Sequence, residues 1–304
     1  MDYIQLFEMG GTTLLLIDVQ RDFHPGGSLA IPTADADAER IVQLLEKSIN
    51  NPIHPKIDRV IATLDSHHKL HIAHPCFWIS GADGITHPRP FTIISHQDVL
   101  EGKWKPRSDL HIDQKTLLHK DFAPSSLLSS CVNQEFFDIT KYCIEYTRLL
   151  EDKGRFQLCI WPEHCLIGSE GHAMHSNVRL ALETWCDTFG KSIEWIMKGQ
   201  NLLTEMYSCL AAEVPISIET SWNQSLLQNL QSEDRIWIVG QAMSHCVNYT
   251  VRDLLNHMLP EERHKVYVLK DCMSPVPGFE KESQDFLSFV SASGANICVS
   301  TDLK

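Results

Sequence analysis

The stretch TTLLLIDVQRDF, residues 12–23, begins with a short apolar run and ends in charged and polar residues. The run from Thr12 to Val19 is continuous rather than alternating, as expected of a strand that is buried on both faces of a parallel sheet. Asp18 lies near the end of this run. The stretch therefore predicts a buried strand that delivers a carboxylate to one edge of a sheet.

Further apolar runs of the same kind follow, and segments with helical periodicity lie between them. The runs are Ile57–Leu64, Ile193–Met197, Arg235–Gly240, Lys265–Lys270 and Ala295–Ser300. The helical segments are Ala34–Ile49, Ser176–Phe189, Ser221–Leu230, Cys246–His257 and Phe279–Ser291. Alternating strands and helices predict a three-layer α/β/α sandwich with a mainly parallel, doubly wound sheet.

One region breaks this alternation. From about Pro75 to Arg155 the sequence is rich in Pro, His, Gly and Ser, and we expect one helix there, near Asn133–Glu151. We interpret the region as a long insertion into a single domain that spans residues 1–304. A lid and an oligomer contact are both consistent with the sequence.

Composition excludes several classes of protein. The chain has 304 residues, 43% of them hydrophobic, which is enough for a substantial core, and its net charge of −13 disfavours nucleic-acid and anionic-membrane partners. Its ten scattered cysteines form no CxxC pair and indicate reduced thiols. The N-terminal segment does not resemble a signal peptide, and no apolar stretch reaches the ~18 residues of a membrane span. We expect a soluble cytoplasmic protein.

The ends of the predicted strands single out a candidate site. Ligands of doubly wound sheets bind at the carboxyl ends of the strands. The residues there are Asp18, Asp65, Lys198 and the turn Gly240–Cys246. Two acids, a lysine and a cysteine are therefore expected at one edge of the sheet.

Cys246 follows the turn VGQAMSH and opens a predicted helix. The helix dipole at such a position lowers a thiol pKa and favours the thiolate nucleophile. Backbone N–H groups without intrahelical partners are also available there to hold an oxyanion. The alternative is a buried structural cysteine.

Asp18 and Lys198 are candidates to assist such a nucleophile. A carboxylate can accept the thiol proton and later protonate a leaving amine. A lysine beside both groups would hold them in their charged forms. The alternatives are a capping or ion-paired aspartate and a solvated surface lysine.

A metal site is indicated separately by Asp65, His67 and His71, which form D-x-H-x-x-x-H, and by His164 in WPEHC. One carboxylate with imidazoles suits Zn²⁺, Fe²⁺ or Mn²⁺, and a bound cation could polarise a ring nitrogen or carbonyl of a substrate. The alternative is chance, because the chain has sixteen histidines.

Four segments of the chain resemble motifs of nicotinamidases and pyrazinamidases, in the isochorismatase-like hydrolase superfamily, and follow the same order. They are IDVQRDFHPGGSLA (17–30), TLDSHHKLH (63–71), WPEHCLIGSEG (161–171), and MKGQNLLTEMYSCL (197–210) with VGQAMSHCV (239–247). They cover under a fifth of the chain. The resemblance implies an isochorismatase-like fold.

The resemblance also implies roles for individual residues. Cys246 would attack the carboxamide carbon, Asp18 would take the thiol proton and give it to ammonia, and Lys198 would support the charged pair. The metal ligands would be Asp65, His67 and His164, with His71 as an additional candidate.

Three further residues acquire roles in the same way. The Gln241–Ala242 bond matches a cis peptide that aims the N–H of Ala242, with that of Cys246, into an oxyanion hole. Phe23 and Trp161 match the aromatic residues that sandwich the substrate ring, and core packing is the alternative for both.

The implied reaction is the hydrolysis of nicotinamide to nicotinate and ammonia through a thioester, with one divalent metal ion, most simply Zn²⁺. The implied partner is a small-molecule amide, and the expected assembly is a homo-oligomer. The long gap between Asp65 and His164 departs from the family pattern, as do Ser169–Glu170, Ser244 and Leu210. Two alternatives therefore stay open: a hydrolase of the same mechanism for another small amide or carbamoyl compound, and a non-catalytic member with a binding role.

Overall fold

The computed structural model describes residues 11–50, 56–110, 112, 118–131 and 137–303. Its centre is a six-stranded sheet whose strand pairings are all parallel in this part of the chain. In spatial order the strands are β10 (Asn296–Cys298), β9 (Val266–Leu269), β8 (Arg235–Gly240), β1 (Thr12–Ile17), β2 (Arg59–Asp65) and β7 (Glu194–Lys198). The predicted parallel sheet is confirmed.

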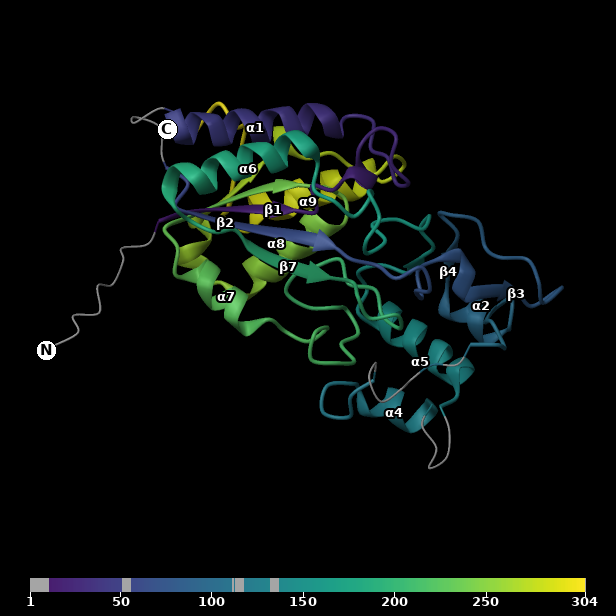
Figure 1. The fold of residues 1–304 in the computed structure, drawn as a ribbon. Coiled ribbons are helices and arrows are strands. Elements are labelled where there is room, and N and C mark those ends of the chain that lie inside the picture. The colour runs from purple at the N-terminus through teal and green to yellow at the C-terminus, as the bar shows by residue number, and fades with distance from the viewer. Residues whose placement is uncertain (1–10, 51–55, 111, 113–117, 132–136, 304) are drawn as a thin grey trace, which may run out of the picture.

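Helices cover both faces of the sheet (Figure 1). Helices α1 (Ala34–Asn50) and α6 (Ser176–Phe189) pack on one face, against side chains that include Leu14 and Leu16. Leu15 and Ile17 point to the opposite face, where α7 (Gln224–Gln231), α8 (Cys246–His257) and α9 (Glu280–Ala292) contribute to the core. Because successive side chains of a strand face opposite sides, a continuous apolar run fills both cores. The three-layer sandwich is therefore confirmed.

Two predicted boundaries are wrong for identifiable reasons. The first strand ends at Ile17 rather than Val19, because Asp18 adopts a left-handed backbone with φ of 47° that cannot continue a strand. The helix expected from Ser221 begins at Gln224, because the side chain of Asn223 accepts a hydrogen bond from the N–H of Leu226 and caps it.

The described residues between 75 and 155, the region that the sequence predicts to be an insertion, form a lobe beyond the carboxyl ends of the strands (Figure 1). It contains more structure than the one helix that the sequence predicts. Its described elements include β3 (Trp78–Ser80), β4 (Ile93–Ile94), α2 (His96–Leu100), β5 (Trp104–Pro106), α4 (Ser125–Cys131) and α5 (Ile139–Asp152). The predicted helix corresponds to α5, which Asp138 caps, and residues 133–136 of that prediction lie outside the described residues. None of the described helices is long and apolar enough to cross a membrane.

The lobe holds two segments, one of which follows a strand of the main sheet. The hydroxyl of Tyr142 on α5 donates to the carbonyl of Leu203, and the hydroxyl of Tyr146 accepts from the N–H of Glu205. Strand β4 pairs with β6 (Leu158–Cys159), which leads directly into Trp161. The lobe therefore holds the loops after β7 and β6 in place.

Gly240 is required where β8 lies against β1. It has φ of 118°, and a Cβ there would lie 2.0 Å from the carbonyl oxygen of Ile17. We expect Gly240→Ala to lower the free energy of unfolding by at least about 2 kcal/mol, because strain and a backbone clash add. The matched control is Gly190→Ala, which also has positive φ but no atom within 4 Å of the added Cβ, and should cost about 1 kcal/mol. Equal losses of unfolding free energy in Gly240→Ala and Gly190→Ala, measured by urea denaturation, would contradict this account.

Candidate active site

A fully buried lysine joins three of the predicted site residues. Lys198 ends β7, and its Nζ lies 2.9 Å from Oδ2 of Asp18, 3.1 Å from Oδ1 of Asp65 and 3.3 Å from Sγ of Cys246. Its fourth partner is the carbonyl of Met206, at 3.3 Å. The side chains of Lys198 and Asp18 have no exposed surface. The structure thus brings the expected acids, lysine and cysteine together at one edge of the sheet.

Asp18 is held in place by the neighbouring strand β2. Its Oδ1 accepts a hydrogen bond of 2.6 Å from the hydroxyl of Thr63, and its own N–H donates to Thr63 Oγ1 and to the carbonyl of Thr63. Burial raises the pKa of Asp18, whereas Lys198 opposes this shift. The carboxylate is therefore fixed in orientation and has an enhanced affinity for a proton.

The thiol of Cys246 differs from the expectation drawn from its place on the helix. Cys246 is the first residue of α8, as predicted. Burial nevertheless raises the pKa of Cys246 well above its usual value; Lys198 acts to lower it, and the negative charge of Asp18 raises it further. The predicted lowered pKa is wrong for the unliganded protein, because desolvation outweighs the dipole and the lysine. The resting cysteine is a protonated thiol next to a carboxylate that can accept its proton.

The turn before Cys246 contains the cis peptide bond Gln241–Ala242 that the resemblance implies. The side chain of Gln241 anchors it, donating to Asp37 and accepting from the N–H of Ser274. Among the described residues, the N–H groups of Ala242 and Cys246 have no hydrogen-bond acceptor, whereas their neighbours at Gln241 and Met243 do. Two free donors thus stand beside the thiol, as an oxyanion hole requires.

A small pocket lies beside Cys246 and is lined by both aromatic residues singled out in the sequence. Its lining residues are Phe23, Leu29, Asp65, His67, Trp161, His164, Glu205, Tyr207, Ala242, His245, Cys246 and Val276. Its walls are mainly apolar and aromatic, with a few polar groups, as is typical of small-molecule sites. Trp161 and Phe23 both border the cavity rather than serving only as core.

Three predicted metal ligands converge in the wall of this pocket. Oδ2 of Asp65 lies 3.0 Å from Nε2 of His67 and 3.2 Å from Nε2 of His164. The Nδ1 atoms of the two imidazoles face the carbonyls of Gly199 and Pro162, at 3.1 and 2.8 Å. A carbonyl can only accept, so each Nδ1 carries the proton and each Nε2 of a neutral ring presents a lone pair. One carboxylate and two imidazoles in this tautomer fit a divalent metal ion.

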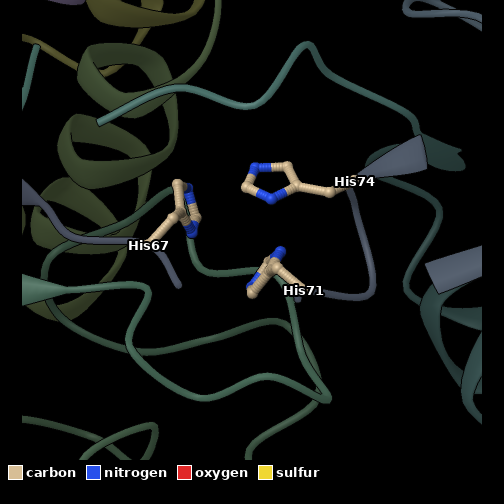
Figure 2. A group of neighbouring side chains, drawn as sticks. All are labelled: His67, His71 and His74. Carbon is tan, nitrogen blue, oxygen red and sulfur yellow. The ribbon is translucent and has the colours of Figure 1, made fainter. Parts of the chain in front are cut away.

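His71 lies with His67 and His74 in a second group of buried imidazoles whose ring nitrogens are close enough to hold a metal ion. Its Nδ1 accepts from the N–H of Ala73 and its Nε2 donates to the carbonyl of Thr204, so both ring nitrogens are used within the protein. Figure 2 shows His74 beside it, with His67. His74 donates through Nδ1 to the carbonyl of Lys69, and its buried Nε2 has no partner among the described residues. Of His71 and His74, it is therefore His74 that has a ring nitrogen without a partner among the described residues. The sequence pattern did not indicate His74 as a ligand.

Three supporting residues were also missed. Gln20 hydrogen-bonds both the N–H and the carbonyl of Asp65. Asp22 accepts from the N–H of Cys165, next to His164. Glu205 lines the pocket, and its buried Oε2 has no hydrogen-bond partner in the described part of the chain. Gln20 and Asp22 belong to the quoted segment IDVQRDF, which was the only sequence signal for them.

We expect His164 and His71 to differ in their effects on metal binding. His164→Ala should weaken binding of Zn²⁺ by at least about 100-fold, because it removes a directed ligand. His71→Ala should change the affinity by less than about tenfold, because neither of its nitrogens is free. The affinities are measured by competition with a chromophoric chelator. A larger loss for His71→Ala than for His164→Ala would contradict the assignment.

The pocket residue His245 makes stability depend on pH. Burial lowers the pKa of His245 to about 3, whereas an unfolded histidine titrates near 6.5. The unfolded chain therefore binds more protons between these values, and stability falls as pH is lowered through this window. Between pH 6.5 and pH 4, the parent protein should lose about 3 kcal/mol more of its free energy of unfolding than His245→Phe does. Chelator-treated proteins are compared by urea denaturation, and parallel profiles would refute the assignment.

The fold was compared with those of known proteins. No protein-family model matches the chain, and no curated protein sequence matches it. Solved structures do match along almost its whole length. The structure of an Acinetobacter baumannii nicotinamidase/pyrazinamidase covers 98% of this chain and is itself covered completely, at 19% identity and a TM-score of 0.59.

Two further structures agree with this result. Yeast nicotinamidase Pnc1p, bound to the inhibitor nicotinaldehyde, is 16% identical, covers 95% of this chain and is covered over 99% of its own, with a TM-score of 0.58. PnC1 from L. infantum, in complex with nicotinate, is 17% identical with coverages of 97% and 96% and a TM-score of 0.54. The chain has the isochorismatase-like fold that these nicotinamidase structures share.

Proposed function

We propose that the chain is a metal-dependent cysteine amidohydrolase of the nicotinamidase-like group, and that its substrate is nicotinamide. The observation that carries this proposal is the cluster around Lys198, whose Nζ touches a carboxylate and a thiol at the base of an aromatic pocket. The likeness of fold to three nicotinamidase structures supports the choice of reaction.

Each residue of the site has a separate role in the proposed reaction. Asp18 accepts the thiol proton, and Cys246 Sγ forms a bond to the carboxamide carbon. The N–H groups of Ala242 and Cys246 stabilise the oxyanion that results. Asp18 then returns the proton to the departing ammonia, and the thioester remains. Asp18 next takes a proton from water, which attacks the thioester carbon. The C–S bond then breaks, Asp18 returns the proton to the departing sulfur of Cys246, and the carboxylic acid is released.

Lys198 stays protonated throughout this cycle. Asp18 and Asp65 raise its pKa well above the usual value despite its burial. A fixed positive charge lowers the energy of the thiolate that forms when the proton moves to Asp18. Lys198 therefore favours the nucleophilic form of Cys246 without exchanging a proton itself.

Asp65, His67 and His164 would hold a divalent metal ion at the pocket wall, with Zn²⁺ the simplest candidate and Fe²⁺ or Mn²⁺ compatible with the same ligands. When bound, such an ion supplies a Lewis acid that orients and polarises a ring nitrogen of the substrate.

The test is release of ammonia and nicotinate from nicotinamide by metal-loaded protein. Turnover by this protein, abolished by chelation, is the expected result. A second candidate function, hydrolysis of another small amide, is favoured by the departures at Ser244 and in the inserted lobe. Turnover of other small amides or carbamoyl compounds, without turnover of nicotinamide, would establish that alternative and refute the assigned substrate.

A further inference from the structure

Two histidines and an aspartate lie together outside the pocket, where three elements meet. His24 follows the short 3-10 helix Arg21–Phe23, Asp35 lies in the first turn of α1, and His175 directly precedes α6. Each of the three offers a ligand atom, and these atoms lie within 4.8 Å of one another. None of the three lines the pocket or belongs to the metal ligands described above. The proposed mechanism therefore gives this outer cluster no role.

The two imidazoles of the outer cluster face the same carboxylate oxygen. Nδ1 of His24 lies 3.0 Å from Oδ1 of Asp35, and Nε2 of His175 lies 3.8 Å from it. Ligand atoms that surround a tetrahedral zinc ion at about 2.1 Å lie roughly 3.4 Å apart, which is between these two distances. The longer distance exceeds that of a hydrogen bond. A cation among the three atoms would thus bind all three side chains at once, which hydrogen bonds alone do not.

Neither imidazole uses both of its nitrogens within the protein. Nε2 of His24 and Nδ1 of His175 are buried and have no hydrogen-bond partner among the described residues. His71 differs from them, because both of its nitrogens are used. Burial lowers the pKa of His24 to about 4 and also lowers the pKa of His175, so both rings are neutral at physiological pH. The neutral imidazole is the form that binds metal ions.

The backbone holds the outer cluster in place and leaves it open to solvent. The N–H of His175 donates to the carbonyl of Val19 at 2.8 Å, and the N–H of His24 donates to the carbonyl of Arg21 at 3.1 Å. The two imidazole rings have their centroids 4.3 Å apart. The side chain of Asp35 is 57% exposed, whereas that of His24 is 4% exposed. A cation can therefore reach prearranged ligands from the solvent, and water can fill its remaining positions.

We infer that His24, Asp35 and His175 form a second site for Zn²⁺ or a similar divalent metal ion, separate from the pocket. Two imidazoles and one carboxylate suit Zn²⁺, whereas Mg²⁺ and Ca²⁺ take oxygen ligands. Phe23, which lines the pocket, directly precedes His24. A cation in this site ties a wall of the pocket to the first turns of α1 and α6, so its role is structural rather than catalytic.

The experiment counts bound zinc and requires no substrate. Chelator-stripped protein is dialysed against the free Zn²⁺ concentration that just saturates the parent, and bound metal is measured per chain. Among the described residues, His67 belongs to both of the other groups of potential ligands, so His67→Ala impairs both and leaves the outer cluster intact. In that background, His175→Phe keeps a ring beside His24 but removes the ligand nitrogen. Asp35→Asn keeps the shape of an exposed side chain but removes its charge.

We expect two zinc ions per parent chain and one in His67→Ala. His175→Phe should weaken binding of the remaining ion by at least about 100-fold, and Asp35→Asn by at least about tenfold, because each impairs a ligand. The remaining ion should also raise the midpoint of thermal unfolding of His67→Ala, since it binds the folded chain. The control is His264→Phe, at an exposed histidine outside all three groups, and it should change neither measurement.

A single zinc ion in the parent that is lost in His67→Ala would overturn the inference, because the outer cluster would then bind none. Unchanged affinity in both His175→Phe and Asp35→Asn would also overturn it, because the second ion would then lie elsewhere. If His67→Ala does not fold, the two substitutions are made in the parent, where each should reduce the count from two zinc ions to one. These outcomes hold whether or not the protein hydrolyses nicotinamide.

Discussion

Cys246→Ala should lower kcat for the amide substrate by at least about 10⁴-fold, because no other group of the site can form the thioester. The thiol is the atom on which the oxyanion donors and Lys198 converge, at 3.3 Å from the lysine nitrogen. Initial rates of ammonia release, measured at saturating substrate in metal-loaded protein, give the effect.

The matched control is Cys186→Ala on α6, a half-exposed cysteine that does not line the pocket. Its kcat should stay within about twofold of the parent. Because the loss in Cys246→Ala is chemical, substrate binding by calorimetry should be retained. Turnover by Cys246→Ala above about 1% of the parent kcat would show that the metal ion activates water for direct attack. That result would contradict the thioester mechanism.

Lys198→Met should be the most destabilising substitution in the site. Methionine fills the volume of the lysine stem but leaves Asp18 and Asp65 as two buried carboxylates without their shared cation. Removing one partner from a buried ion pair costs about 3–5 kcal/mol. Activity should fall with it, because the thiolate loses the neighbouring positive charge.

The loss should shrink as the pH is lowered, because protonation of Asp18 and Asp65 removes the unpaired charges. Urea denaturation at neutral and acid pH measures this. Lys191→Met is the control, since its amine donates to the exposed carbonyl of Asp58. If Lys198→Met does not fold, Asp18→Asn in the same chain should restore part of the stability. A pH-independent loss, or no rescue, would mean that the lysine contributes packing alone.

The strands could be predicted because each is a continuous apolar run that both faces of a parallel sheet require. The six predicted runs correspond to β1, β2 and β7 to β10. The small strands of the lobe could not be predicted in this way. Pairs such as β4 with β6 are two residues long and join segments more than sixty residues apart, so they have no periodicity of their own.

The positions of the site residues followed from the rule that parallel strands end at one edge, whereas two details required coordinates. Whether His71 or His74 has a free nitrogen depends on which backbone carbonyls lie nearby. The direction of the Cys246 pKa depends on how completely the thiol is desolvated. Both details depend on the residues that pack around the motif in the folded protein, so the local sequence does not predict them.

The central place of β1 has a consequence for the order of events during synthesis. β1 carries Asp18 and pairs on one side with β2, but its other neighbour, β8, lies more than two hundred residues later in the chain. During synthesis, the edge of β1 that pairs with β8 therefore stays unpaired until residue 240 has left the ribosome. Because such long-range pairing is slow and exposes strand edges, the chain should depend on protection by chaperones during translation. No amidohydrolase activity should appear before synthesis is nearly complete.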